Sequence, residues 1–168
     1  MLKRKVLTAT MAATALAVAG TAGAATATTT FGVSATVLKT CSVAAAALGF
    51  GNYTPGAGAL AANTTVNVKC TKATPFTGAL NGGTTTGGTI AQRLMTNGTD
   101  TLQYNLFTTA GFATIFGDGV TGVTVPGVGT GLATAVAVTV FGSLPDNAIN
   151  QGVSTGAYAD TINVTVTY

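Results

Sequence analysis

The chain has 168 residues, of which 47% are hydrophobic and only 7% are charged, and its formal net charge at pH 7 is +3. The absence of histidine excludes histidine-based catalytic triads and histidine-ligated metal sites. Three of the seven basic residues lie at positions 3–5, and the other four are balanced by four aspartates. Beyond its start the chain therefore gives no electrostatic reason to expect nucleic acid or anionic lipid as a partner.

Residues 1–24 have the form of a secretory signal peptide. Lys3, Arg4 and Lys5 precede an apolar stretch that runs from Val6 to about Gly20, and small residues follow at positions 22–24. We expect cleavage after Ala24, which leaves 144 of the 168 residues as one exported domain. The apolar stretch is short for a membrane span, so no retained anchor and no membrane insertion are expected.

The next stretch, residues 31–37, alternates strictly. Its apolar members are spaced by two residues, which places them on one face of an extended chain: Phe31, Val33, Ala35 and Val37. The pattern predicts a half-buried strand. It is either the first strand of an ordinary β-sandwich or a strand that inserts into another copy of the protein.

Cys41 and Cys70 are the only cysteines, 29 residues apart. An even number of cysteines in an exported chain predicts one disulfide, because the compartment outside the cytoplasm is oxidising. Closing a loop of this size stabilises a fold by roughly 3 to 4 kcal/mol.

Short alternating segments separated by turn residues continue to the end of the sequence, and no long amphipathic helical pattern occurs. The predicted strands are 64–70, 76–80, 102–106, 112–116, 136–140 and 162–168, with a glycine-rich connection over 117–131 and a break at Pro145. This pattern predicts an all-β, immunoglobulin-like sandwich. An eight-stranded outer-membrane barrel is the alternative, but the aromatic residues are too few to form its two girdles.

Catalytic residues are poorly represented. The four aspartates lie apart in turn-like contexts, and the glycine-rich stretch 81–88 is not followed by the Gly-Lys-Ser/Thr of a phosphate-binding loop. We therefore expect no enzyme activity, no metal and no cofactor.

The final segment ends the sequence without a following strand to pair beside it. Its apolar side chains alternate on one face: Ile162, Val164, Val166 and Tyr168. A sandwich that stops one strand early has an unpaired edge and an open groove, which proteins normally avoid. A strand added from another chain would satisfy both, with 162–168 as the accepting edge.

A series of landmarks in fixed order identifies a family. They are Cys41-Ser42-Val43, Leu48-Gly49-Phe50-Gly51-Asn52-Tyr53, Val66-Asn67-Val68-Lys69-Cys70, Arg93-Leu94-Met95, Leu102-Gln103-Tyr104-Asn105-Leu106-Phe107, Phe116-Gly117-Asp118-Gly119, Val140-Phe141-Gly142-Ser143-Leu144-Pro145 and Gly156-Ala157-Tyr158-Ala159-Asp160-Thr161. Together they resemble the spore coat U domain proteins, whose members include subunits of archaic chaperone–usher pili. One departure is Phe116, where relatives often carry tryptophan.

The resemblance implies an incomplete immunoglobulin-like sandwich over residues 38–168 that is completed by donor-strand exchange. It implies that residues 25–37 are the donor strand, with Phe31, Val33, Ala35 and Val37 as plug residues, and that Cys41 and Cys70 form the family disulfide. The implied partners are other pilins, a periplasmic chaperone and an outer-membrane usher.

The implied function is that of a structural pilus subunit at the cell surface, in fibres for adhesion and biofilm formation. A tip adhesin would usually carry a second, receptor-binding domain. The alternative within the same fold is a secreted coat or matrix protein that does not polymerise.

Overall fold

The structure, a computed structural model, describes residues 23–168 and divides the chain into two units, 1–35 and 36–168. The predicted signal peptide therefore lies almost wholly outside the described residues. Residues 23–40 form no helix and no strand.

Residues 41–168 contain eight strands and one helical turn. They are β1 (Cys41–Ala45), β2 (Leu60–Cys70), β3 (Pro75–Leu80), β4 (Arg93–Thr96), β5 (Thr101–Phe107), β6 (Val125–Val128), β7 (Val136–Leu144), α1 (Ala148–Gln151) and β8 (Val164–Thr167). The predicted all-β class is confirmed.

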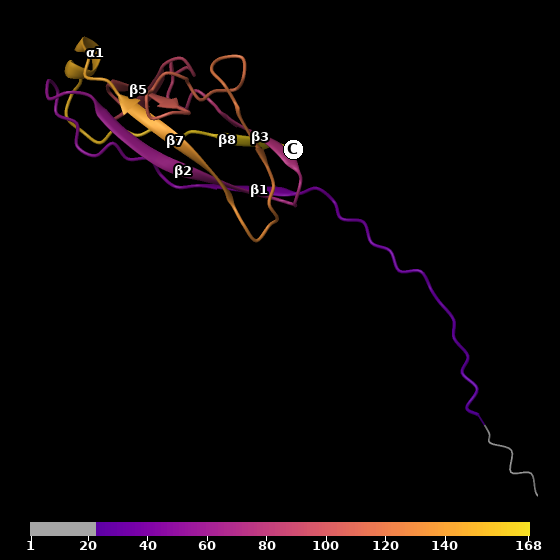
Figure 1. Ribbon diagram of the computed structural model, residues 1–168. Coiled ribbons are helices and arrows are strands. Elements are labelled where there is room, and N and C mark those ends of the chain that lie inside the picture. The colour runs from indigo at the N-terminus through magenta and orange to yellow at the C-terminus, as the bar shows by residue number, and fades with distance from the viewer. Residues whose placement is uncertain (1–22) are drawn as a thin grey trace, which may run out of the picture. The chain divides into compact units, whose positions relative to one another are not determined.

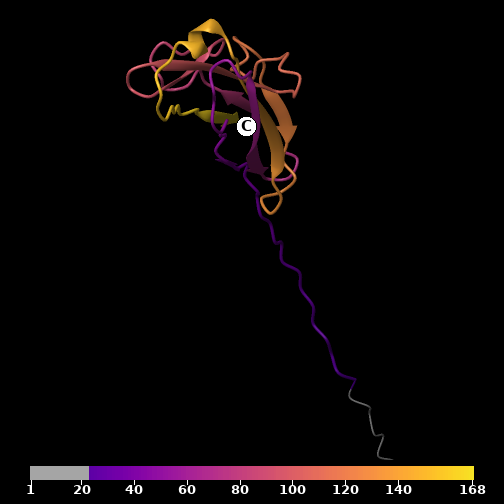
Figure 2. The ribbon, with the colours of Figure 1, turned by 90° about the vertical axis from the view of Figure 1, so that its left-hand side faces the viewer.

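The strands form two sheets, as expected for a sandwich. A five-stranded sheet has the order β1-β2-β7-β5-β4, and a three-stranded sheet has the order β6-β3-β8. All pairs are antiparallel. In Figure 1, β1, β2 and β7 run side by side, and the quarter turn in Figure 2 shows yellow β8, a strand of the other sheet, apart from orange β7.

The core lies between the two sheets. Along β2, residues Val66, Val68 and Cys70 are buried while Asn67 and Lys69 between them are exposed, as the alternation predicts. The buried apolar residues come from both sheets and from the connection after β5: Val66, Val68, Cys70, Phe76, Leu80, Leu102, Tyr104, Leu106, Phe116, Val140 and Leu144.

Five predicted segments correspond to strands, namely β2, β3, β5, β7 and β8, and β7 ends at Leu144 just before Pro145 as expected. The predicted strand 112–116 is wrong. Phe112 has a positive φ of 53°, which strands do not accommodate, and Ile115 and Phe116 make only isolated bridges.

Strand β6 was missed because Pro126 and Gly127 are poor strand formers. As an edge strand, β6 needs hydrogen bonds on one side only, which permits Pro126. Gly127 lies opposite Phe76 on β3, and any side chain there would clash with the Phe76 ring. A residue that weakens a strand in isolation is required here by the packing.

Helix α1 was also missed. The side chain of its Asn150 makes the hydrogen bonds that a neighbouring strand would otherwise make to β5. β7 ends at Leu144 and pairs only with residues 105–107 of β5, so the first half of β5 has no partner on β7. The buried Asn150 side chain accepts from the Gln103 backbone N–H at 2.8 Å and donates to the Gln103 carbonyl at 2.9 Å. One amide therefore satisfies both backbone groups of a buried strand residue.

Candidate functional site

The edge strands β1 and β8 belong to different sheets and lie next to each other. Each has one hydrogen-bonded neighbour, β2 for β1 and β3 for β8. Within residues 41–168, no strand pairs with the second edge of either. Each therefore offers a row of backbone N–H and C=O groups to an added strand.

The inner face of β1 is uncovered. Val43 and Ala45 lie opposite Val68 and Val66 in an antiparallel register, so their side chains point to the same interior face. Val68 and Val66 are 1% and 4% exposed, whereas Val43 is 40% exposed and Ala45 is also exposed. The three-stranded sheet ends at β8 and does not extend under β1.

A groove of about 390 Å³ enters the core between these two edges. Its floor is made of core side chains from both sheets, including Val66, Leu80, Leu106 and Val140. A second hollow of about 670 Å³ adjoins the first, and four residues line both: Leu48, Phe50, Met95 and Tyr158. The groove between the two edges is the candidate site.

The segment before β8 forms one rim of the groove and is held by both backbone and side-chain hydrogen bonds. Ala159 exchanges two backbone hydrogen bonds with Thr96 on β4, each of 3.0 Å, and the Asn163 N–H donates to Asn81 at 2.9 Å. Between them, the Asp160 carboxylate accepts from the Tyr104 hydroxyl on β5 at 2.6 Å.

These contacts shift the pKa values of both partners. Burial alone would raise the pKa of Asp160, but the hydrogen bonds from Tyr104, Thr84 and Thr85 hold it below its usual value. Burial, followed by the hydrogen bond to Asp160, raises the pKa of Tyr104. The folded chain therefore carries an ionised Asp160 and a neutral Tyr104 on this rim.

The segment after β1 forms the opposite rim. Leu48 and Phe50 pack over Gly142 of β7, where a side chain would meet both of them at 2.9 to 3.1 Å. Farther along, the Tyr53 hydroxyl donates to Asp146 at 2.6 Å, and the N–H groups of Gly56 and Gly58 donate to the same carboxylate. One aspartate thus contributes hydrogen bonds to each rim, Asp160 to the first and Asp146 to the second.

The Tyr53–Asp146 contact also shifts both pKa values. Burial and the hydrogen bond to Asp146 raise the pKa of Tyr53 to about 12. The bonds from Tyr53 and the two glycine N–H groups lower the pKa of Asp146 to about 2.

The predicted disulfide is confirmed: Cys41 and Cys70 are bonded, and they are also direct partners in the β1–β2 register. It fastens the groove-side strand β1 to the rest of the five-stranded sheet.

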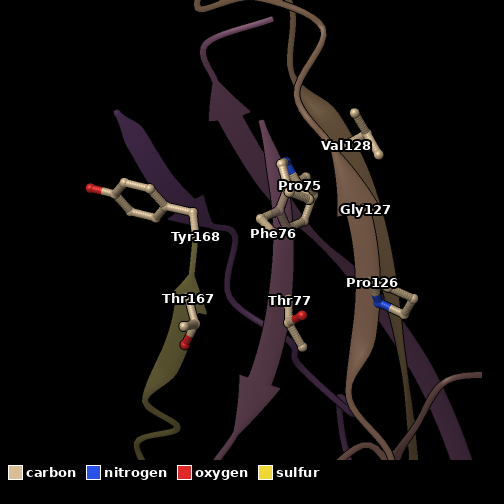
Figure 3. A pocket seen from close by; sticks show the side chains of 8 residues that line it. All are labelled: Pro75, Phe76, Thr77, Pro126, Gly127, Val128, Thr167 and Tyr168. Atoms are coloured by element: carbon tan, nitrogen blue, oxygen red, sulfur yellow. The ribbon is translucent and has the colours of Figure 1, made fainter. Parts of the chain in front are cut away.

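The predicted accepting-edge residues are divided between three places. Ile162 and Val164 line the groove, and Val166 packs against the core. Tyr168 lies beyond the end of β8, is 55% exposed, and lines a separate shallow hollow of about 570 Å³ on the three-stranded sheet. Figure 3 shows its ring directed away from β3. The structure thus brings the first two together at the groove and places Tyr168 elsewhere.

The predicted plug residues do not lie in a strand in this structure. Phe31, Val33 and Val37 are 85% to 86% exposed, and Ala35 is exposed as well. The expected half-buried strand at 31–37 is therefore not formed within the single chain, because these residues pair with no strand. The donor-strand assignment stays a prediction.

Several residues of the groove and its rims were not anticipated in their roles, although all but Asp146 lie within the landmarks. Leu48 and Phe50 alternate over only two or three residues, and Asp146 and Asp160 are lone carboxylates 93 and 56 residues from the tyrosines they bind. The sequence shows only that each aspartate lies near the end of a predicted strand. This position does not indicate which residue the aspartate binds.

The described part of the chain, residues 23–168, has no helix long and apolar enough to cross a membrane. The same residues contain no group of three or more histidine, cysteine, aspartate or glutamate side chains able to hold a metal ion.

Comparison with known proteins identifies the family. Residues 27–165 match the Spore Coat Protein U domain. One chain in the crystal structure of the CsuC–CsuE chaperone–tip adhesion subunit pre-assembly complex, from archaic chaperone–usher Csu pili of Acinetobacter baumannii, is similar with a TM-score of 0.54 and 23% identity.

That structural match covers 79% of this chain and 40% of the other, and at this identity it supports the fold alone. No curated protein matches the chain. The domain match, in contrast, covers most of the sequence, as the ordered landmarks led us to expect. The chain therefore belongs to the Spore Coat Protein U domain family.

Proposed function

We propose that this protein is a structural subunit of a chaperone–usher pilus. Its groove between β1 and β8 accepts a β-strand from another chain, and its own residues 25–37 are the strand it donates. The observation that carries this proposal is the uncovered inner face of β1 beside a groove that reaches the core. An added strand would supply both apolar side chains and a second ladder of backbone hydrogen bonds.

The family supports the same assignment, and the similar Csu complex contains a chaperone with a tip adhesion subunit before assembly. In this proposal the chain is exported, escorted by a periplasmic chaperone and assembled at an outer-membrane usher. The resulting surface fibre serves adhesion and biofilm formation. Other copies of the chain, or related pilins, are its neighbours in the fibre.

The plug residues suit this groove. Phe31, Val33 and Val37 are large, apolar and exposed, and with Ala35 they share one face. Burying each large one is worth about 1.5 to 3 kcal/mol. Separation requires the whole strand to leave at once, which makes the fibre kinetically stable.

A self-complemented subunit tests strand acceptance. Residues 25–37 are appended after Tyr168 through a flexible linker, and the melting temperature and oligomeric state are measured. We expect a monomer with a clearly raised melting temperature, whereas the same extension carrying Val33→Asp in the appended copy should have little effect. An unmodified monomer whose melting temperature the extension leaves unchanged would instead favour a non-polymerising secreted coat or matrix protein.

A matched pair of variants tests donation. Val33→Asp places a charge on the plug face, and Ser34→Asp places the same charge on the opposite face. We expect normal levels of chaperone-bound subunit for both and surface fibres for Ser34→Asp only. Equal assembly by the two variants, or loss of the Val33→Asp subunit itself, would contradict the donor role of this segment.

A further inference from the structure

Asp160 joins three parts of the chain at the edge of the groove. One carboxylate oxygen accepts from Tyr104 on β5 at 2.6 Å. The other accepts from the backbone N–H groups of Thr84 and Thr85, at 2.9 and 3.0 Å, and from both of their hydroxyls. Asp160 itself lines the groove four residues before β8 begins.

The connection after β3 is shaped to receive this carboxylate. Gly83 has a positive φ of 92°, and a side chain at this position would overlap the Asp160 carboxylate. Asn81 in the same connection accepts from the Arg93 Nε at 2.9 Å through its carbonyl and from the Asn163 N–H through its side chain. The connection thus binds the rim at two points, Asp160 and Asn163.

A buried arginine, Arg93, lies near the Tyr104–Asp160 contact. Arg93 lies opposite Tyr104 in the β4–β5 register and is 0% exposed, and it donates to the carbonyls of Asn81 and Phe116 and to the Asn105 side chain. Burial lowers the pKa of Arg93, but its interactions with Tyr104 and Asp160 oppose that shift. Tyr104 therefore has the buried Arg93 as its register partner and the ionised Asp160 as its hydrogen-bond partner.

This arrangement holds a rim that has little strand pairing of its own. Residues 158–162 line the groove, yet regular pairing with β3 starts only at Val164, and before it the backbone makes only an isolated bridge between Ala159 and Thr96 and one hydrogen bond between Asn163 and Asn81. We propose that Asp160 is a positioning residue, which holds the β8-side rim in its strand-accepting position before a donor strand arrives. This inference rests on the proposed function and adds the residue that prepares the groove. A preformed rim lowers the ordering cost of binding, so its loss slows association.

The test measures association of a labelled peptide of residues 25–37. The binding partner is the full mature chain carrying Val33→Asp, so that its own segment competes poorly. We expect Asp160→Asn to lower the association rate constant about tenfold and Tyr104→Phe about threefold, in line with loss of charge-assisted hydrogen bonds. Asp118→Asn is the control, because its carboxylate caps an exposed turn through the Val120 and Thr121 N–H groups.

A second readout separates positioning from general stabilisation. In the chain with the strand appended after Tyr168, the added strand itself holds the rim, so both variants should melt within a few degrees of their parent. Association rates within twofold of the parent for both variants would overturn the inference. Tyr104→Phe removes one hydroxyl only, so it carries the test if Asp160→Asn does not accumulate. Failure of the parent chain to bind the peptide would instead remove the proposed function, and this inference with it.

Discussion

Strand β2 pairs in regular register with two neighbours, β7 and β1. The inward side chains at the end of β7 are buried, whereas those of β1 beyond its cysteine are exposed. On one side β7 pairs with β2 from Leu60 to Val68, and its Val140 and Leu144 are 3% and 1% exposed. On the other side β1 pairs over five residues, and its inward Val43 is 40% exposed. Backbone pairing is therefore independent of burial here, because burial needs a second sheet below the strand.

The comparison shows what holds each strand. β7 lies between β2 and β5 and faces the core, whereas β1 has the β2 ladder and the disulfide. A strand with so little apolar burial is held mainly by covalent and backbone bonds. In the proposed function, the donor strand of another chain would cover this inner face.

The largest effect should come from removing the disulfide. Replacing both Cys41 and Cys70 by alanine should lower the free energy of unfolding by about 3 to 4 kcal/mol, because it releases a loop of this size in the unfolded chain. Urea unfolding measures this, and a reducing agent should affect the parent chain and not the double variant. A change below about 1 kcal/mol would mean that the β2 ladder alone suffices to hold β1.

Leu144→Ala should cost about 3 kcal/mol, since it opens a cavity at the buried end of β7. The same urea measurement detects it. The effect should be nearly equal with and without the appended donor strand. A cost that depends strongly on the appended strand would show that the strand also acts on this end of β7.

Acid should weaken the rim beside β1. The pKa of Asp146 falls from 3.8 to about 2 on folding, so its stabilising contribution is present above pH 3.8 and is lost as the pH falls through about 2. The melting temperature should therefore decrease over this interval. Tyr53→Phe removes the hydroxyl that contributes most to the shift, so its pH dependence should be weaker, and an identical profile would contradict this assignment.

Val43→Ala should have the smallest effect and the most informative one. In the unmodified chain it should change the free energy of unfolding by less than about 0.5 kcal/mol, because the side chain is already half exposed. In the self-complemented chain the same change should cost about 1 kcal/mol or more, since Val43 is then covered. Equal costs in both would mean that the strand does not cover β1.

Features that depend on residues close together in the sequence were predictable, and features that depend on contacts between distant residues were not. Alternation in β2, β3, β5, β7 and β8 is local, so these strands were predicted, as was the stop at Pro145. Strand β6 was not, since only contact with Phe76 explains Gly127. Within the candidate site, Ile162 and Val164 were predicted from their spacing, but the Tyr53–Asp146 and Tyr104–Asp160 contacts join residues 93 and 56 positions apart.

By itself, the sequence determined the all-β class, the disulfide and the family, because alternation, cysteine count and ordered landmarks are properties of the chain alone. Only the tertiary structure decided which strands are edges and where the core is open. An alternating segment has the same pattern whether or not a sheet covers it: Val43 and Val68 are direct partners in one register, yet Val43 is 40% exposed and Val68 is 1% exposed. That difference depends on how many strands each sheet contains, which is a property of the whole fold.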